Sequence, residues 1–108
     1  MKKFDAEYKL LESMYWDGYF PNFLVDKVRE LVQEVIDFLE IGERDLEKIQ
    51  DKFDEMTLAI NDLQEEFEEN GSELETAARD SIGETVEYIL HWFDIDINVE
   101  KAIGERDW

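Results

Sequence analysis

The chain has 108 residues, and its 30 acidic against 11 basic side chains give a net charge of −19. This length is typical of one domain, and a hydrophobic content of 44% is too high for a disordered acidic chain, so residues 1–108 are expected to form a single acidic domain. Such a surface repels nucleic acids and anionic membranes, and the absence of cysteine excludes thiol catalysis, disulfides and thiolate metal sites.

The first two predicted elements are helices joined by an aromatic turn. Aromatic and leucine residues at helical spacing predict a first helix over residues 4–15. An Asp-Gly pair and the only proline then mark a turn over residues 15–22. A second helix is predicted over residues 22–41, with apolar residues over a wide face, and Gly42 is placed to end it.

The third predicted helix has the clearest periodicity. Asp45 is the expected N-cap, and Asn70-Gly71 is a left-handed stop signal. Between them the apolar residues alternate steps of three and four; they are Leu46, Ile49, Phe53, Met56, Ile60, Leu63 and Phe67. This stripe can pack within one chain or against a second copy, so the sequence leaves a homodimer open.

The fourth predicted helix spans residues 72–93. Ser72 and Glu75 have the spacing of a capping box at its start. Gly83 in its interior costs about 1 kcal/mol relative to alanine, which predicts a close approach by a neighbouring helix. A short helix is predicted over residues 99–104.

Together these elements predict an all-α fold. Because helices joined by short connections pack antiparallel, the expected architecture is an antiparallel helical bundle of four main helices plus a short C-terminal helix. No run approaches the roughly 20 apolar residues of a membrane span, and no apolar stretch follows the basic start as in a signal peptide. A cytoplasmic location is therefore expected.

One stretch of the sequence, residues 53–78, has no basic side chain but nine carboxylates. Like charges on adjacent helical turns, and anions near a helix C-terminus, are each slightly destabilising. The stretch is either a surface for a basic protein or a divalent cation, or a solvated face. The candidate partner-binding acids in it are Glu65, Glu66, Glu68, Glu69 and Glu73.

The aromatic turn supplies the other candidate interaction residues. Four aromatic residues at this turn are either anchors for a protein partner or a plug for one end of the bundle; they are Trp16, Tyr19, Phe20 and Phe23. Trp108 poses the same choice, because a C-terminal tryptophan either packs on the body of the domain or offers an exposed anchor.

Two patterns are candidates for metal binding. Glu84 and Glu87 share a helical face with His91 and could form a single weak site. Residues 94–105 place oxygen ligands at positions 1, 3, 5 and 12 of a calcium loop, but Val99 occupies the position that requires glycine. We expect the polar residues of this segment to cap the short helix instead, with its isoleucines packed inward.

Catalysis has little basis in the sequence. We find no pairing of a nucleophile with the single histidine and no glycine-rich phosphate loop. No catalytic residue, metal ligand or cofactor is therefore predicted, and the chain is expected not to be an enzyme.

Three segments resemble a family of small uncharacterised bacterial proteins, a domain of unknown function. They are Tyr19–Val28, Ile60–Asn70 and the C-terminal Arg106-Asp107-Trp108. The resemblance implies a bacterial, cytosolic protein and brings no activity, cofactor or site residue. From charge we expect a non-enzymatic, acidic protein-interaction module, of which an immunity or inhibitor protein against a basic toxin or nuclease is one form. The alternative is a carboxylate-based protein that binds a divalent metal.

Overall fold

The structure, a computed structural model, describes residues 2–108. It contains α1 (Glu12–Trp16), α2 (Asn22–Glu40), α3 (Leu46–Glu69), α4 (Thr76–Trp92) and α5 (Val99–Ala102). Among these residues no strand occurs, so the predicted all-α class is confirmed.

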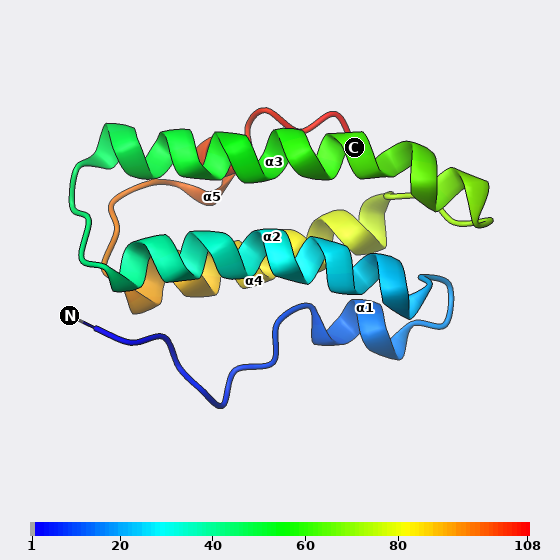
Figure 1. The fold of residues 1–108 in the computed structure, drawn as a ribbon, viewed down its shortest axis with the longest axis horizontal. Helices are drawn as coiled ribbons and strands as arrows, with labels where there is room; N and C mark the ends of the chain where they lie inside the picture. Colours follow the sequence, from blue (N-terminus) through cyan, green and yellow to red (C-terminus); the bar gives the residue numbers. More distant parts are fainter. Residues whose placement is uncertain (1) are drawn as a thin grey trace.

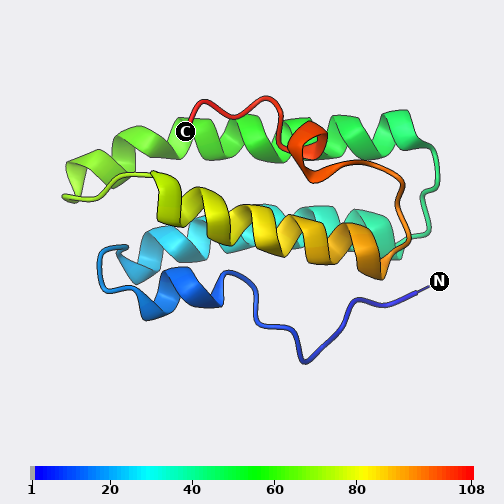
Figure 2. The same ribbon diagram turned by 180° about the vertical axis from the view of Figure 1, so that it is seen from behind.

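Three long helices form the body of the molecule (Figures 1 and 2). The chain reverses direction from α2 to α3 and again from α3 to α4, while α5 and the C-terminal residues lie along α3. The extended residues 2–11 and the short α1 take the position that a fourth long helix would occupy. The radius of gyration is 13.4 Å, near the ~13 Å typical of a domain of about 100 residues.

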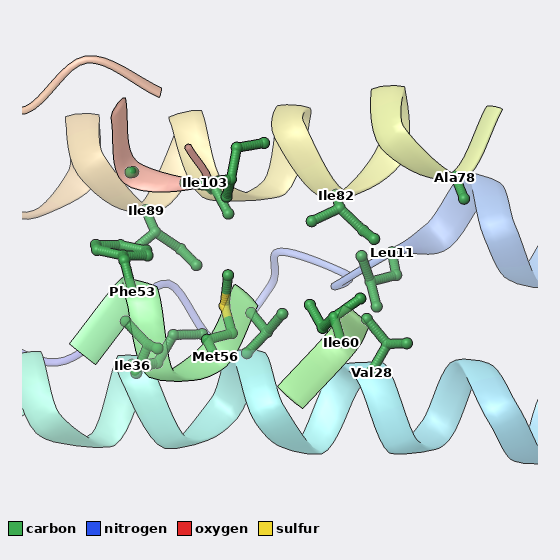
Figure 3. Close-up of a cluster of buried hydrophobic side chains, with 14 of the residues drawn as sticks. Leu11, Val28, Ile36, Phe53, Met56, Ile60, Ala78, Ile82, Ile89 and Ile103 are labelled. Carbon is green, nitrogen blue, oxygen red and sulfur yellow. The ribbon is translucent and has the colours of Figure 1, made fainter. Parts of the chain in front are cut away.

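The core lies between α2, α3 and α4. Figure 3 shows Phe53, Met56 and Ile60 of α3 pointing toward Ile82 and Ile89 of α4, with side chains of α2 on the other side. All of these α3 and α4 side chains are buried. Because most of the α3 stripe is buried within one chain, it is not available to a second copy.

Both ends of α3 are set by local signals that the sequence predicts. At the start, the Asp45 carboxylate accepts hydrogen bonds from the backbone N–H groups of Glu47 at 2.9 Å and Lys48 at 3.4 Å, and it thus satisfies two of the donors left free at a helix N-terminus. At the end, Gly71 has a φ of 76°, which glycine adopts without the steric cost of a side chain.

The prediction of a helix over residues 4–15 is wrong, because only α1 is helical in this region. The Asp5 carboxylate accepts a hydrogen bond from the backbone of Glu7 at 2.9 Å, and this local turn competes with a helix. Leu11, buried and with a φ of 56°, lies directly before α1. The spacing of Tyr8 therefore reflects contacts with α4 rather than a helical face.

The predicted capping box is also wrong. Ser72 is buried and belongs to the end of α3, since its backbone N–H donates to the Phe67 carbonyl at 2.9 Å. Helix α4 begins at Thr76 after Glu75, whose side chain makes no capping hydrogen bond. Gly83 is not a close helix–helix contact either, because the nearest atom to a Cβ added there is Ile103 Cδ1 at 4.0 Å.

The C-terminal residues are pinned to α3. The Asn61 side chain donates to the Glu105 carbonyl at 2.9 Å and accepts from the Asp107 backbone N–H at 3.2 Å. Trp108 is only 7% exposed, so it packs on the body of the domain and is not an exposed anchor.

Candidate interaction surface at one end of the bundle

The aromatic turn and the connection between α3 and α4 meet at the same end of the bundle (Figure 1). Phe20 joins them, because its ring lies edge-on to that of Phe67 near the end of α3, with ring centres 6.4 Å apart. Tyr19 lies in turn edge-on to Phe20 at 5.2 Å. The structure thus brings together two features that are 50 residues apart in the sequence, as between Tyr19 and Glu69.

Short-range hydrogen bonds fix the shape of the aromatic turn. The Asp17 carboxylate accepts from the backbone N–H of Tyr19 at 3.1 Å, and the Asp17 carbonyl accepts from that of Phe20 at 3.3 Å. The Pro21 carbonyl then accepts the first two bonds of α2. A turn held in this way has little backbone entropy left to lose on binding.

The end of α3 is held equally well. In addition to the bond from Ser72, the backbone N–H of Gly71 donates to the Glu68 carbonyl at 3.1 Å. Together with the positive φ of Gly71, this is a Schellman motif. The acidic residues on both sides of the motif therefore occupy fixed positions.

Of the four aromatic candidates at the turn, three are exposed and one is buried. Trp16 is 83% exposed and Tyr19 is 42% exposed, whereas Phe20 is only 3% exposed and plugs the bundle. Phe23, in the first turn of α2, is 51% exposed. Phe20 is thus not available as a contact residue, whereas Trp16, Tyr19 and Phe23 are exposed.

The acidic residues also divide into two groups. Glu66 forms an ion pair with Lys27 of α2, with 2.6 Å between Oε2 and Nζ. Its carboxylate is therefore already neutralised by a cation of the same chain. Glu65, Glu68 and Glu69 are exposed on the last turns of α3, and Glu73 is exposed in the connection that follows. Glu75, at the start of α4, is exposed as well.

Tyr19 links the aromatic and acidic parts of this end. Its pKa is raised, first by partial burial and then by the negative charges of Glu75 and Glu73. A phenol with the ordinary pKa of 10.0 is already protonated at neutral pH, and the upward shift extends its role as a hydrogen-bond donor further into alkaline pH. We call the exposed side chains at this end the end surface; its members are Trp16, Tyr19, Phe23, Glu65, Glu68, Glu69, Glu73 and Glu75.

The metal candidates do not form a site. Among residues 2–108, no three potential ligands gather in a metal-binding arrangement. His91 is exposed, and its Nε2 lies 3.9 Å from Oε1 of Glu87. The neighbour of this imidazole is therefore a single carboxylate.

The segment proposed as a calcium loop has a structural role. Asp94 has a φ of 54° and, with Ile95, ends α4 in a second Schellman motif, since the Ile95 N–H donates to the Leu90 carbonyl at 2.9 Å. The Asn98 side chain caps α5 by accepting from the Glu100 N–H at 2.7 Å. Ile95 is buried and Ile97 partly buried, as expected for capping residues with inward-facing isoleucines.

The fold and the end surface define a small, acidic, all-α domain. The chain belongs to the family described as "Family of unknown function (DUF5713)", whose model matches residues 4–108. The resemblance to a domain of unknown function is thereby confirmed at that level. No curated protein and no solved structure matches the chain.

Proposed function

We propose that this protein is a non-enzymatic interaction module that binds a basic protein through the end surface. The observation that carries the proposal is the meeting of exposed aromatic side chains with unpaired carboxylates on two fixed turns. Aromatic residues are the side chains that most often dominate binding energy at protein interfaces. Surrounding carboxylates favour a partner of opposite charge and raise its association rate.

The charge arrangement at this end gives a second line of support. The last turn of α3 has no basic residue, although a cation there would stabilise the helix by about 0.3–1 kcal/mol. Glu65, Glu68 and Glu69 occupy the end of α3 instead. Such a placement is unfavourable for the isolated helix, and a basic partner would relieve it.

The proposed role is of the immunity or inhibitor kind, directed against a basic toxin or nuclease, in the cytoplasm of a bacterium. No helix within residues 2–108 has the length and apolar character needed to cross a membrane. Divalent-metal binding is not proposed, since no cluster of ligands within the same residues supports it.

An affinity capture from the native host's lysate tests the proposal. The control bait is an unrelated folded protein of similar size and net charge. We expect a basic protein that this chain retains and the control loses, with retention that falls as salt rises because charge attraction is screened. If both baits retain the same basic proteins, the acidic surface serves solubility and the proposal is wrong.

A further inference from the structure

A hollow of about 660 Å³ lies between the N-terminal segment and α2. This volume falls within the roughly 300–1,000 Å³ typical of small-molecule sites. Phe4 and Glu40 line one end of it, where the backbone N–H of Phe4 donates to the Glu40 carboxylate at 2.7 Å. Lys9, Tyr15, Trp16 and Arg29 also line the hollow. We call this hollow the N-terminal groove.

The groove exists because the N-terminal segment is extended. A long helix in this position would pack its side chains into α2 along its whole length. Residues 2–11 instead run beside α2 and α4 without forming a helix (Figure 2), and the hollow lies between this segment and α2.

Two carboxylates of the groove are already engaged. Glu40 holds the Phe4 backbone N–H. Asp5 accepts from the Tyr88 hydroxyl at 2.7 Å and from the Glu7 backbone N–H at 2.9 Å. These acceptors are therefore occupied by donors of the chain itself.

Unlike these two carboxylates, the two cations that line the groove are not paired with groups of opposite charge in the described residues. Within residues 2–108, Lys9 and Arg29 form no ion pair, although acidic residues outnumber basic ones by 30 to 11. Partial burial raises the pKa of Tyr15, the hydrogen bond to Asp26 raises it further, and Arg29 on the other side lowers it, so the Tyr15 hydroxyl lies between opposing charges. The Arg29 guanidinium is thus placed beside the Tyr15 hydroxyl, and it has no carboxylate partner within residues 2–108. Glu12 is the third carboxylate that lines the groove, and its side chain makes no hydrogen bond within residues 2–108.

We propose that the N-terminal groove binds a small organic oxyanion carried on an aromatic ring. Arg29 and Lys9 bind the oxyanion, because a guanidinium can donate two parallel hydrogen bonds to a carboxylate or phosphate. Tyr15 and Trp16 pack against the ring of the ligand, because aromatic rings attract one another in edge-to-face or offset arrangements. The ring is required as well as the charge, because the negative field of the whole protein disfavours a bare anion.

The test is a titration of the full chain followed through its backbone amide NMR signals. Phenylacetate and phenyl phosphate are the probes, and they distinguish a carboxylate from a phosphate. Phenylacetamide and inorganic phosphate are the controls that lack the charge or the ring. We expect saturable shifts at Lys9, Tyr15, Trp16 and Arg29 with at least one probe, and binding at least about tenfold weaker for both controls.

A pair of variants locates the binding. Lys9→Gln with Arg29→Gln is expected to weaken probe binding at least about tenfold. The matched variant, Lys101→Gln with Arg44→Gln, removes the same charge from exposed cations outside the groove and is expected to bind as the wild type does. The amide spectrum itself reports whether each variant is folded.

Three results would overturn the inference: no saturable shift with either probe, equal binding of a control and a probe, or equal weakening by the two variants. The groove lies along α2 and apart from the acidic turns of the end surface. The groove shares Trp16 with the end surface, but its cations Lys9 and Arg29 lie outside that surface. The Lys9 and Arg29 variant therefore tests this inference without altering a member of the end surface.

Discussion

Helix α3 and the N-terminal segment are both held against α4, but by different means. In α3, apolar residues at helical spacing bury one continuous face, and Phe53 and Ile60 are fully buried. In the N-terminal segment, Phe4 alone contacts four aromatic rings, with centre distances of 5.9–6.0 Å. Order in α3 thus comes from a repeated pattern, whereas order in the N-terminal segment comes from the geometry of a few rings.

This difference has a consequence for stability. Loss of one core side chain in α3 affects the whole bundle, because side chains of both α2 and α4 line the core into which α3 packs (Figure 3). Loss of one ring in the N-terminal segment affects a region that lacks helical hydrogen bonds over residues 2–11. Such regions open with a lower free energy than the rest of a protein. The substitutions below test the contrast.

The largest effect is expected for Phe53→Ala. The side chain is fully buried between α3 and α4, and its loss leaves a cavity, so the free energy of unfolding should fall by roughly 3–5 kcal/mol. Urea denaturation measures this change. Glu55→Ala, an exposed position two residues further along the same helix, should change stability by no more than about 0.5 kcal/mol.

Phe4→Ala is expected to have a smaller and more local effect. Phe4 is partly buried, and loss of its ring contacts should cost roughly 1–3 kcal/mol. Amide hydrogen exchange should accelerate over residues 2–11 while the amides of α3 keep their protection. Equal acceleration in both regions would show that the N-terminal segment and the bundle unfold together.

Two glycines test the backbone contribution with opposite signs. Gly71→Ala should destabilise the protein by about 1 kcal/mol, because an alanine is strained at a φ of 76°. Gly83→Ala should stabilise it by about 0.5–1 kcal/mol, because the position is helical and its nearest neighbour is at an ordinary contact distance of 4.0 Å. Thermal or urea unfolding of both variants decides the signs.

The smallest expected effect concerns Asp5 and pH. The hydrogen bonds from Tyr88 and from the Glu7 backbone hold the Asp5 pKa below its ordinary value of 3.8. A lowered pKa in the folded state stabilises the fold above the ordinary value, and this contribution is lost as pH falls through the lowered pKa. The stability difference between the wild type and Asp5→Ala should therefore shrink only in acid, and a difference independent of pH would contradict the assignment.

The parts of the fold that follow from local signals could be predicted from the sequence. The periodicity of α3, its Asp45 cap and its glycine stop are all encoded within a few residues of where they act. The N-terminal segment could not be predicted in this way. The rings of Tyr8 and Tyr88, 4.0 Å apart and stacked, come from opposite ends of the chain, and only the tertiary fold places them together.

The same distinction applies to the candidate site. Composition correctly locates exposed acids and aromatic residues in two segments. Which aromatic side chain turns inward depends on the path of the turn, so Phe20 could not be told from Phe23. The ion pair of Glu66 with Lys27 depends on how α2 and α3 are aligned, which the sequence of either helix does not determine.

The most direct test of the account is the affinity of the captured basic partner for charge-matched variants, measured by calorimetry. One variant carries Glu68→Lys, Glu69→Lys and Glu73→Lys at the end surface. The other carries the same change at exposed acids of the long helices, Glu30, Glu34 and Asp51. The account predicts that the first variant loses at least about tenfold in affinity while the second retains most of it. Equal losses would mean that the partner responds to net charge alone, and the end surface would not be its binding site.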